Sequence, residues 1–188
     1  VLYKILQEKK IKISENAAFL MIAAIVSDTL FFNSPTTTPE DKKIAKELNK
    51  IARINIKKLA RDMFKAKSCL KGIKTEDIIE KDYKFYQMGK SKVGIGVWET
   101  VDSASVNEKK TAVMDALKKK KKKDGLDYLF FGVVDILKEE THLYLLGDRE
   151  EKLAKAVFGG KVSGGTILLE KVVSRKKQIA PLLNKKLL

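Results

Sequence analysis

The stretch YLFFGVV, residues 128–134, is a continuous apolar run of strand-forming residues. A run of this length without polar alternation is typical of a strand that is buried on both faces. A helical pattern lies on each side of this run. The first leads into the lysine run at residues 118–123, and Ser103 or Ser105 is its predicted N-cap; the second covers residues 149–158. Further strands are predicted at residues 82–87, 92–100, 142–146 and 162–170. The sequence therefore predicts an α/β domain with a mixed sheet.

The first part of the chain has a different pattern, because only helical periodicity occurs there. Residues 17–26 are apolar on nearly every side, which predicts a central, buried helix with Ser14 as its N-cap. Other helices are predicted over residues 1–10, after Thr38 and after Asn55.

Residues 68–74 lack periodicity, and we predict a domain linker there. The expected organisation is therefore a helical first domain, residues 1–67, and a mixed α/β second domain, residues 75–188. Val1 is not a Met, and apolar residues already form a helical stripe at the start of the chain. We interpret the sequence as a fragment that begins inside a helix.

Composition limits the classes of partner. The formal net charge is +15, to which residues 118–123 contribute six lysines. A basic protein attracts anions such as phosphate compounds, nucleic acid or acidic lipid. The single cysteine, Cys69, excludes an internal disulfide and fits a reducing cytosol, so a cytoplasmic location is expected. The longest apolar run, residues 17–26, is half of the roughly 20 residues that a membrane span needs, which argues against a membrane partner.

The segment VVSRKKQ, residues 172–178, follows a strand and opens a helix that Ser174 caps and Pro181 interrupts. A helix N-terminus presents free N–H groups and a partial positive charge, which attract anions. Cations in this first turn oppose the helix dipole and destabilise the helix unless an anion lies among them. Local chemistry leaves two interpretations open, a phosphate-binding turn and a solvated basic helix end.

Asp28 ends the predicted buried helix and is followed by the polar segment SPTTT, residues 34–38. A carboxylate in such a position is a candidate ligand for manganese or another hard cation, which favour carboxylate oxygen. The alternative is a carboxylate that caps the turn or pairs with a lysine. The residues by themselves leave both open.

Two of these segments resemble known motifs. AIVSDTL, residues 24–30, and VSRKKQ, residues 173–178, are similar to motifs of the manganese-dependent inorganic pyrophosphatases called family II, which belong to the DHH phosphoesterases. Intervening segments such as KVGIG, residues 92–96, match in order and spacing, so the resemblance covers essentially the whole chain. It implies that residues 1–67 are the helical end of an α/β phosphoesterase domain and that residues 75–188 are the DHH-associated C-terminal domain, which binds substrate.

The resemblance also implies roles for four residues. Asp28 matches a metal ligand, Lys84 matches a substrate-binding lysine, and Arg175 and Lys176 match the pair that holds the phosphates during catalysis. The implied reaction is hydrolysis of pyrophosphate to two phosphates by a metal-activated water. The implied cofactor is Mn²⁺, with Co²⁺ as an alternative and Mg²⁺ usable.

The remaining metal ligands of the family are not among these residues, and His142 cannot replace them because it lies on a strand of the other domain. The fragment is therefore expected to be inactive alone. The homodimer typical of the family is expected for the intact protein, whereas the fragment can be a monomer.

Two other functions stay open from the sequence. A short-chain exopolyphosphatase shares parts of both motifs, although the intact SRKKQ run favours pyrophosphate. A basic nucleic-acid-binding module needs a contiguous basic face. Residues 118–123 are interpreted instead as a solvated helix end, because lysines suit a helix C-terminus and no aromatic residues are interleaved with them for base stacking. No nucleic-acid partner is therefore expected.

Overall fold

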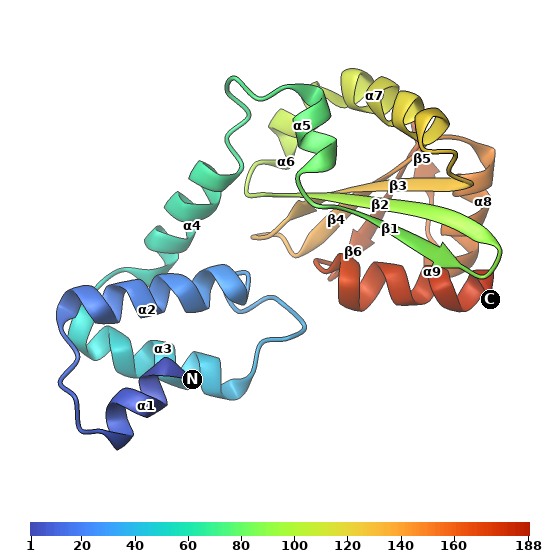
Figure 1. Ribbon diagram of the computed structural model, residues 1–188. Coiled ribbons are helices and arrows are strands. Elements are labelled where there is room, and N and C mark those ends of the chain that lie inside the picture. The colour runs from blue at the N-terminus through green and yellow to red at the C-terminus, as the bar shows by residue number, and fades with distance from the viewer. The chain divides into compact units, whose positions relative to one another are not determined.

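The computed structural model describes residues 1–188. The chain divides into two compact units, Val1–Ala66 and Lys67–Leu188, which are described separately below (Figure 1). None of its helices combines the length and the apolar character that crossing a membrane requires.

The first unit is built of helices. They are α1 (Leu2–Glu8), α2 (Glu15–Asp28), α3 (Pro39–Ala52) and α4 (Ile56–Lys67), whose last residue belongs to the second unit. Ser14 caps α2, since its Oγ accepts a hydrogen bond from Ala17 N at 3.3 Å. Thr38 and Asp41 cap α3 reciprocally, with Thr38 N donating to Asp41 Oδ2 at 2.8 Å and Asp41 N donating to Thr38 Oγ1 at 3.2 Å. The backbone hydrogen bond from Thr38 holds the pKa of Asp41 below its usual value.

The prediction that α2 is buried on nearly every side is wrong. Only Ala18, Ile22 and Val26 are buried, whereas Phe19 is 39% and Leu20 65% exposed. These three buried residues recur every four positions and therefore lie along one face of the helix. The reason is that α3 packs along α2 within this unit, and the unit contains no sheet that could cover the opposite side.

The second unit contains one six-stranded sheet. Its strands are β1 (Tyr83–Met88), β2 (Ser91–Thr100), β3 (Tyr128–Asp135), β4 (Glu140–Leu145), β5 (Val162–Ser163) and β6 (Thr166–Glu170). They lie in the order β1-β2-β3-β4-β6-β5, and β1 is an edge strand. Only β2 and β3 pair in parallel, so the sheet is mixed, as predicted.

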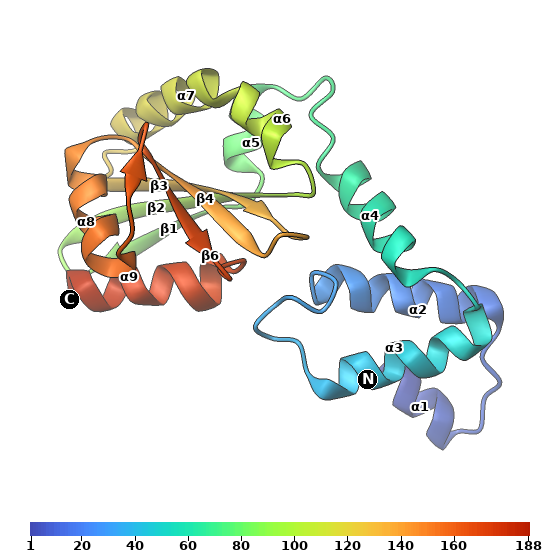
Figure 2. The same cartoon turned by 180° about the vertical axis from the view of Figure 1, so that it is seen from behind.

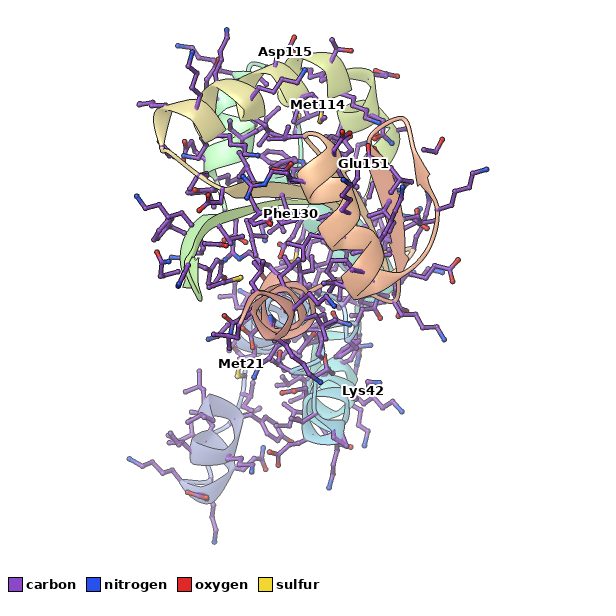
Figure 3. The ribbon with its side chains drawn as sticks, turned by 90° about the vertical axis from the view of Figure 1, so that its right-hand side faces the viewer. Met21, Lys42, Met114, Asp115, Phe130 and Glu151 are labelled. Carbon is purple, nitrogen blue, oxygen red and sulfur yellow. The ribbon has the colours of Figure 1, made fainter.

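Helices cover both faces of this sheet (Figures 1 and 2). One layer holds α5 (Thr75–Glu80), α6 (Ser103–Glu108) and α7 (Lys110–Lys123), and the other holds α8 (Asp148–Phe158) and α9 (Ala180–Leu187). Strand β3 contributes side chains to the core on both faces of the sheet. Phe131 packs on the side of α7, and Phe130 packs on the side of α8 and α9; both rings are fully buried. Figure 3 shows Phe130 inside the unit and Asp115 on the outer side of α7. The continuous apolar run is therefore explained by burial on both faces.

A second prediction, which concerned the connection from β2 to β3, is wrong. The single helix expected to lead into the lysine run is two helices, and the N-cap is Asp102, whose Oδ1 accepts a hydrogen bond from Ser105 N at 3.3 Å. The first helix ends because Lys109 N donates to Val106 O, three residues back, at 3.0 Å. Val106 of the first helix and Val113 of the second are both buried in the core.

The two-layer core predicts a large difference between two chemically identical substitutions. Phe130→Ala removes a fully buried ring and is expected to lower the free energy of unfolding by about 3–5 kcal/mol. Phe85→Ala, on a ring that is 53% exposed, is the matched control and is expected to cost about 1 kcal/mol or less. Urea titration followed by the fluorescence of the single tryptophan, Trp98, measures both. Equal losses would contradict the assigned core.

Candidate functional site

The segment RKKQI forms a π-helical turn, Arg175–Ile179 (η1), between β6 and α9. Its wide hydrogen bonds run from Ile179 N to Ser174 O at 3.3 Å and from Ala180 N to Arg175 O. Ser174 is the N-cap, as predicted, because its Oγ accepts from Lys177 N at 3.2 Å. Pro181 does not interrupt the helix as expected; it lies in the first turn of α9, where a missing N–H removes no helical bond. Single π-turns are rare and occur frequently at functional sites.

Gln178 holds this turn in place. Its Oε1 accepts from Val173 N at 3.0 Å and from Ser174 N at 3.1 Å, and its Nε2 donates to the carbonyl of Lys171 at 2.7 Å. The side chain thus satisfies three backbone groups that no strand or helix would satisfy. The sequence contained Gln178 within the motif but gave no reason for an amide there.

Arg175 points from η1 to the edge of the sheet. Its Nη1 lies 2.8 Å from Asp82 Oδ1 and also donates to the carbonyl oxygen of Asp82. The side chain is only 11% exposed, and its Nε is buried without a hydrogen-bond acceptor. Sequence analysis missed Asp82; the one available signal was an acidic residue directly before the strand that carries Lys84.

Lys84 lies on β1, two residues beyond Asp82, and its side chain is exposed. Side chains alternate along a strand, so Lys84 shares a face with Tyr86 and Met88, which pack toward α9. An open cavity of about 420 Å³ on that side is lined by Tyr86, Met88 and Lys176, among others. At a rise of about 3.3 Å per residue, Lys84 is about 7 Å along the strand from both Asp82 and Tyr86. The structure therefore brings Lys84, Arg175 and Lys176 to one edge of the second unit.

A second cavity, of about 260 Å³, borders Asp82 and includes Lys67, Lys81 and Glu99 in its lining. Its lysines already have partners in the protein. Lys67 Nζ lies 2.6 Å from Glu99 Oε2, and Lys81 Nζ donates to the carbonyl of Lys67 at 2.8 Å. The cavity is therefore a weaker candidate for anion binding than the edge that holds Arg175.

The lysine run at residues 118–123 is not simply solvated, as the sequence suggested. Lys120 Nζ lies 2.7 Å from Glu80 Oε1, and Lys121 Nζ lies 2.5 Å from Glu150 Oε1. These pairs connect the end of α7 to α5 and α8. Part of the positive charge that a nucleic-acid surface would need is thus neutralised within the unit.

Asp28 belongs to the first unit, where it is the exposed last residue of α2. The three residues after Thr29 have positive φ angles: 48° at Leu30, 54° at Phe31 and 69° at Phe32. Three successive left-handed residues other than glycine are a strained conformation, of order 1–3 kcal/mol each. The hydroxyl of Thr29 supports the turn by donating to Ile25 O at 2.7 Å and accepting from Phe32 N at 3.0 Å. Strain that the surrounding structure maintains beside a carboxylate is typical of a functional site.

The donor set of this chain does not by itself fit a metal centre. No group of three or more His, Cys, Asp or Glu side chains lies together. His142 pairs with Glu140 at 3.2 Å on β4, and Asp135 is buried, accepting from Ser103 Oγ at 3.0 Å. Asp135 thus has a structural role. A single carboxylate, Asp28, cannot build a two-metal site.

The chain is similar to proteins of known class. The family model described as DHHA2 domain matches residues 61–186. A manganese-dependent inorganic pyrophosphatase of Methanocaldococcus jannaschii is 40% identical over 92% of this chain and 56% of its own length. A probable manganese-dependent inorganic pyrophosphatase of Clostridium acetobutylicum is 38% identical over 93% of this chain and 56% of its own length. A cobalt-dependent inorganic pyrophosphatase of Clostridium perfringens is 36% identical over 93% of this chain and 32% of its own length.

A solved structure agrees with these relatives. The crystal structure of a putative family II inorganic pyrophosphatase of Methanococcus jannaschii superposes with a TM-score of 0.78 at 38% identity. The match covers 94% of this chain and 57% of that one. The chain thus spans about half the length of the manganese-dependent relatives that it matches.

The contacts of Gln178 generate a prediction about the η1 turn. Gln178→Ala leaves three backbone groups without their partner and is expected to destabilise the second unit by about 1–3 kcal/mol. Hydrogen exchange at the amides of Val173 and Ser174 is expected to become at least about tenfold faster, because the turn opens locally.

Gln87→Ala is the matched control, since the exposed side chain of Gln87 makes one hydrogen bond, to the carbonyl of Gly89 at 3.0 Å. It is expected to leave exchange at Val173 and Ser174 unchanged. Equal protection of these amides in the wild type and in Gln178→Ala would show that the amide does not hold the turn.

Proposed function

Because the chain belongs to the DHHA2 domain family, and its relatives over nine-tenths of its length are named inorganic pyrophosphatases, we propose that the protein hydrolyses pyrophosphate to two phosphates. The observation that supports this most directly is the grouping of Lys84, Arg175 and Lys176 at the β1 edge of the second unit. In this proposal the second unit binds the substrate.

The chemistry of these cations suits a diphosphate. The planar guanidinium of Arg175 can hold two oxygens of one phosphoryl group at once, while Lys84 and Lys176 act as mobile point charges. Cations placed at phosphoryl oxygens stabilise the negative charge that develops as the anhydride bond breaks. The π-turn sets the backbone positions from which the side chains of Arg175 and Lys176 extend.

The proposed cofactor is Mn²⁺ or Co²⁺, which the names of the relatives specify. Asp28 is the proposed ligand within this chain, and the strained turn that follows it supports that assignment. No group of three or more His, Cys, Asp or Glu side chains accompanies Asp28, so we assign the other ligands to the rest of the protein. The homodimer and the cytoplasmic location remain predictions.

Pyrophosphate binding to this chain tests the role of the cations without any metal. Arg175→Ala and Lys176→Ala are each expected to weaken binding roughly 10–100-fold in isothermal titration calorimetry, because each removes a charge-assisted contact of about 1.5–3 kcal/mol. Lys177→Ala is the matched control: the residue is adjacent, exposed and equally charged, and its removal is expected to change affinity no more than about threefold.

If all three variants lost affinity equally, binding would depend on net charge alone and the assigned site would be wrong. Duplex DNA serves as a competitor in the same titration. Pyrophosphate is expected to bind equally well in its presence, whereas displacement by DNA would favour the nucleic-acid-binding interpretation.

A phosphate-release assay compares the activity of this chain with that of the full-length protein. With Mn²⁺ and pyrophosphate, the 188-residue chain is expected to release no phosphate above background, because one carboxylate cannot complete the metal centre. The full-length protein is expected to turn over, with a higher kcat/KM for pyrophosphate than for tripolyphosphate. Fast release by the chain alone would contradict the proposed division of roles, and a preference for tripolyphosphate would indicate an exopolyphosphatase.

A further inference from the structure

We propose that Asp82 is a positioning residue, which locks the guanidinium of Arg175 so that its Nε–Nη2 edge binds two oxygens of one phosphoryl group. This inference rests on the proposed function and deepens it, since it assigns a role to a residue that no motif contains. Of the three nitrogens that carry the five N–H donors of Arg175, Asp82 engages one and leaves the other two free.

Asp82 engages Arg175 through one nitrogen only. The carboxylate Oδ1 forms an ion pair with Nη1 at 2.8 Å, and the carbonyl oxygen of the same residue accepts a hydrogen bond from Nη1. Both contacts fall on Nη1 and therefore hold this end of the guanidinium beside Asp82.

Asp82 is itself immobilised. Its carbonyl also accepts a hydrogen bond from Val97 N of β2 at 3.1 Å, so the backbone that precedes β1 is tied to the sheet. The residues that meet here are 93 positions apart in the sequence. The guanidinium of Arg175 is thus held by a residue that is bonded to the sheet, while the backbone of Arg175 lies on the π-turn.

The free donors of Arg175 point to a ligand. Nε is buried and has no acceptor in the protein, although an unsatisfied buried donor is costly. Nε–H and one N–H of Nη2 lie side by side and form one edge of the planar guanidinium. Nη1, the nitrogen that contacts Asp82, is not part of this edge. This side-on fork matches the spacing of two phosphoryl oxygens. The arrangement leaves unpaired the one edge that suits bidentate binding.

Charge and orientation predict opposite effects when Asp82 is removed. A carboxylate beside three cations repels an anion, so its loss raises pyrophosphate affinity if only the local potential matters. If Asp82 instead orients Arg175, its loss weakens binding, because the guanidinium is free to leave the bidentate geometry. The sign of the change therefore decides between the two.

The experiment titrates pyrophosphate into the wild-type chain, Asp82→Ala and Asp82→Asn. Asp82→Ala is expected to bind roughly tenfold more weakly, and Asp82→Asn to recover part of the loss, because its amide oxygen can still accept from Nη1. Asp115→Asn is the matched control: it removes the same charge from an exposed position on the outer side of α7, and wild-type affinity is expected. In an Arg175→Ala background, Asp82→Ala is expected to cause no further weakening.

A spectroscopic readout follows the orientation itself. The chain has four arginines, Arg53, Arg61, Arg149 and Arg175, so the Nε–H signal of Arg175 can be assigned in ¹⁵N NMR spectra by substitution. In the wild type, pyrophosphate is expected to shift this signal strongly, because Nε–H gains its acceptor. In Asp82→Ala the shift is expected to be much smaller at equal saturation, and in Asp82→Asn intermediate.

The outcomes separate this inference from the function on which it rests. If the wild type does not bind pyrophosphate, the proposed function fails and the inference with it. If the wild type binds but Asp82→Ala binds equally or more tightly with the same Nε–H shift, the function stands and the positioning role is overturned. A purely structural ion pair would lower the thermal stability of Asp82→Ala and move neither readout.

Discussion

The contact between Arg175 and Asp82 joins the turn after β6 to the residue before β1, and the arrangement of the candidate site depends on it. It is a direct side-chain link between the SRKKQ segment and the start of the strand that carries Lys84. The contact is partly shielded from solvent, since the Arg175 side chain is 11% exposed and that of Asp82 46% exposed. Lys84, Arg175 and Lys176 lie at the same edge of this unit, and repulsion among their like charges is reduced when an anion binds there.

The surrounding structure is organised to maintain this contact. Gln178 completes the hydrogen bonds of the turn, and Ile179 and Leu183 anchor the turn and α9 in the core that also contains Met88 of β1. Lys84 on the edge strand β1 remains exposed, and an open cavity lies beside Tyr86 of the same strand. A buried support therefore carries two exposed lysines, Lys84 and Lys176, and the largely buried Arg175, an arrangement that suits recognition of a small anion.

Particular residues show why sequence reasoning succeeded for the elements. The apolar run at residues 128–134 is buried on both faces, and Ser14, Thr38 and Ser174 each cap the helix or turn that follows them. These features depend on neighbours within a few positions. The errors have the opposite origin. The exposure of Phe19 and Leu20 depends on which faces of α2 are covered. The break between α6 and α7 at Lys109 had no signal in the local pattern of residues.

The sequence by itself determined the mixed α/β class, the approximate positions of nearly all helices and strands, and Lys84, Arg175, Lys176 and Asp28 as candidates, because periodicity, capping and motif spacing are local properties. Only the tertiary structure decided that Asp82 holds Arg175, that Gln178 closes the turn, and that the backbone after Asp28 is left-handed. These features arise from contacts across as many as 93 positions, or from backbone strain that the rest of the fold must support. No local pattern of residue types encodes either, because both depend on where distant segments are packed together.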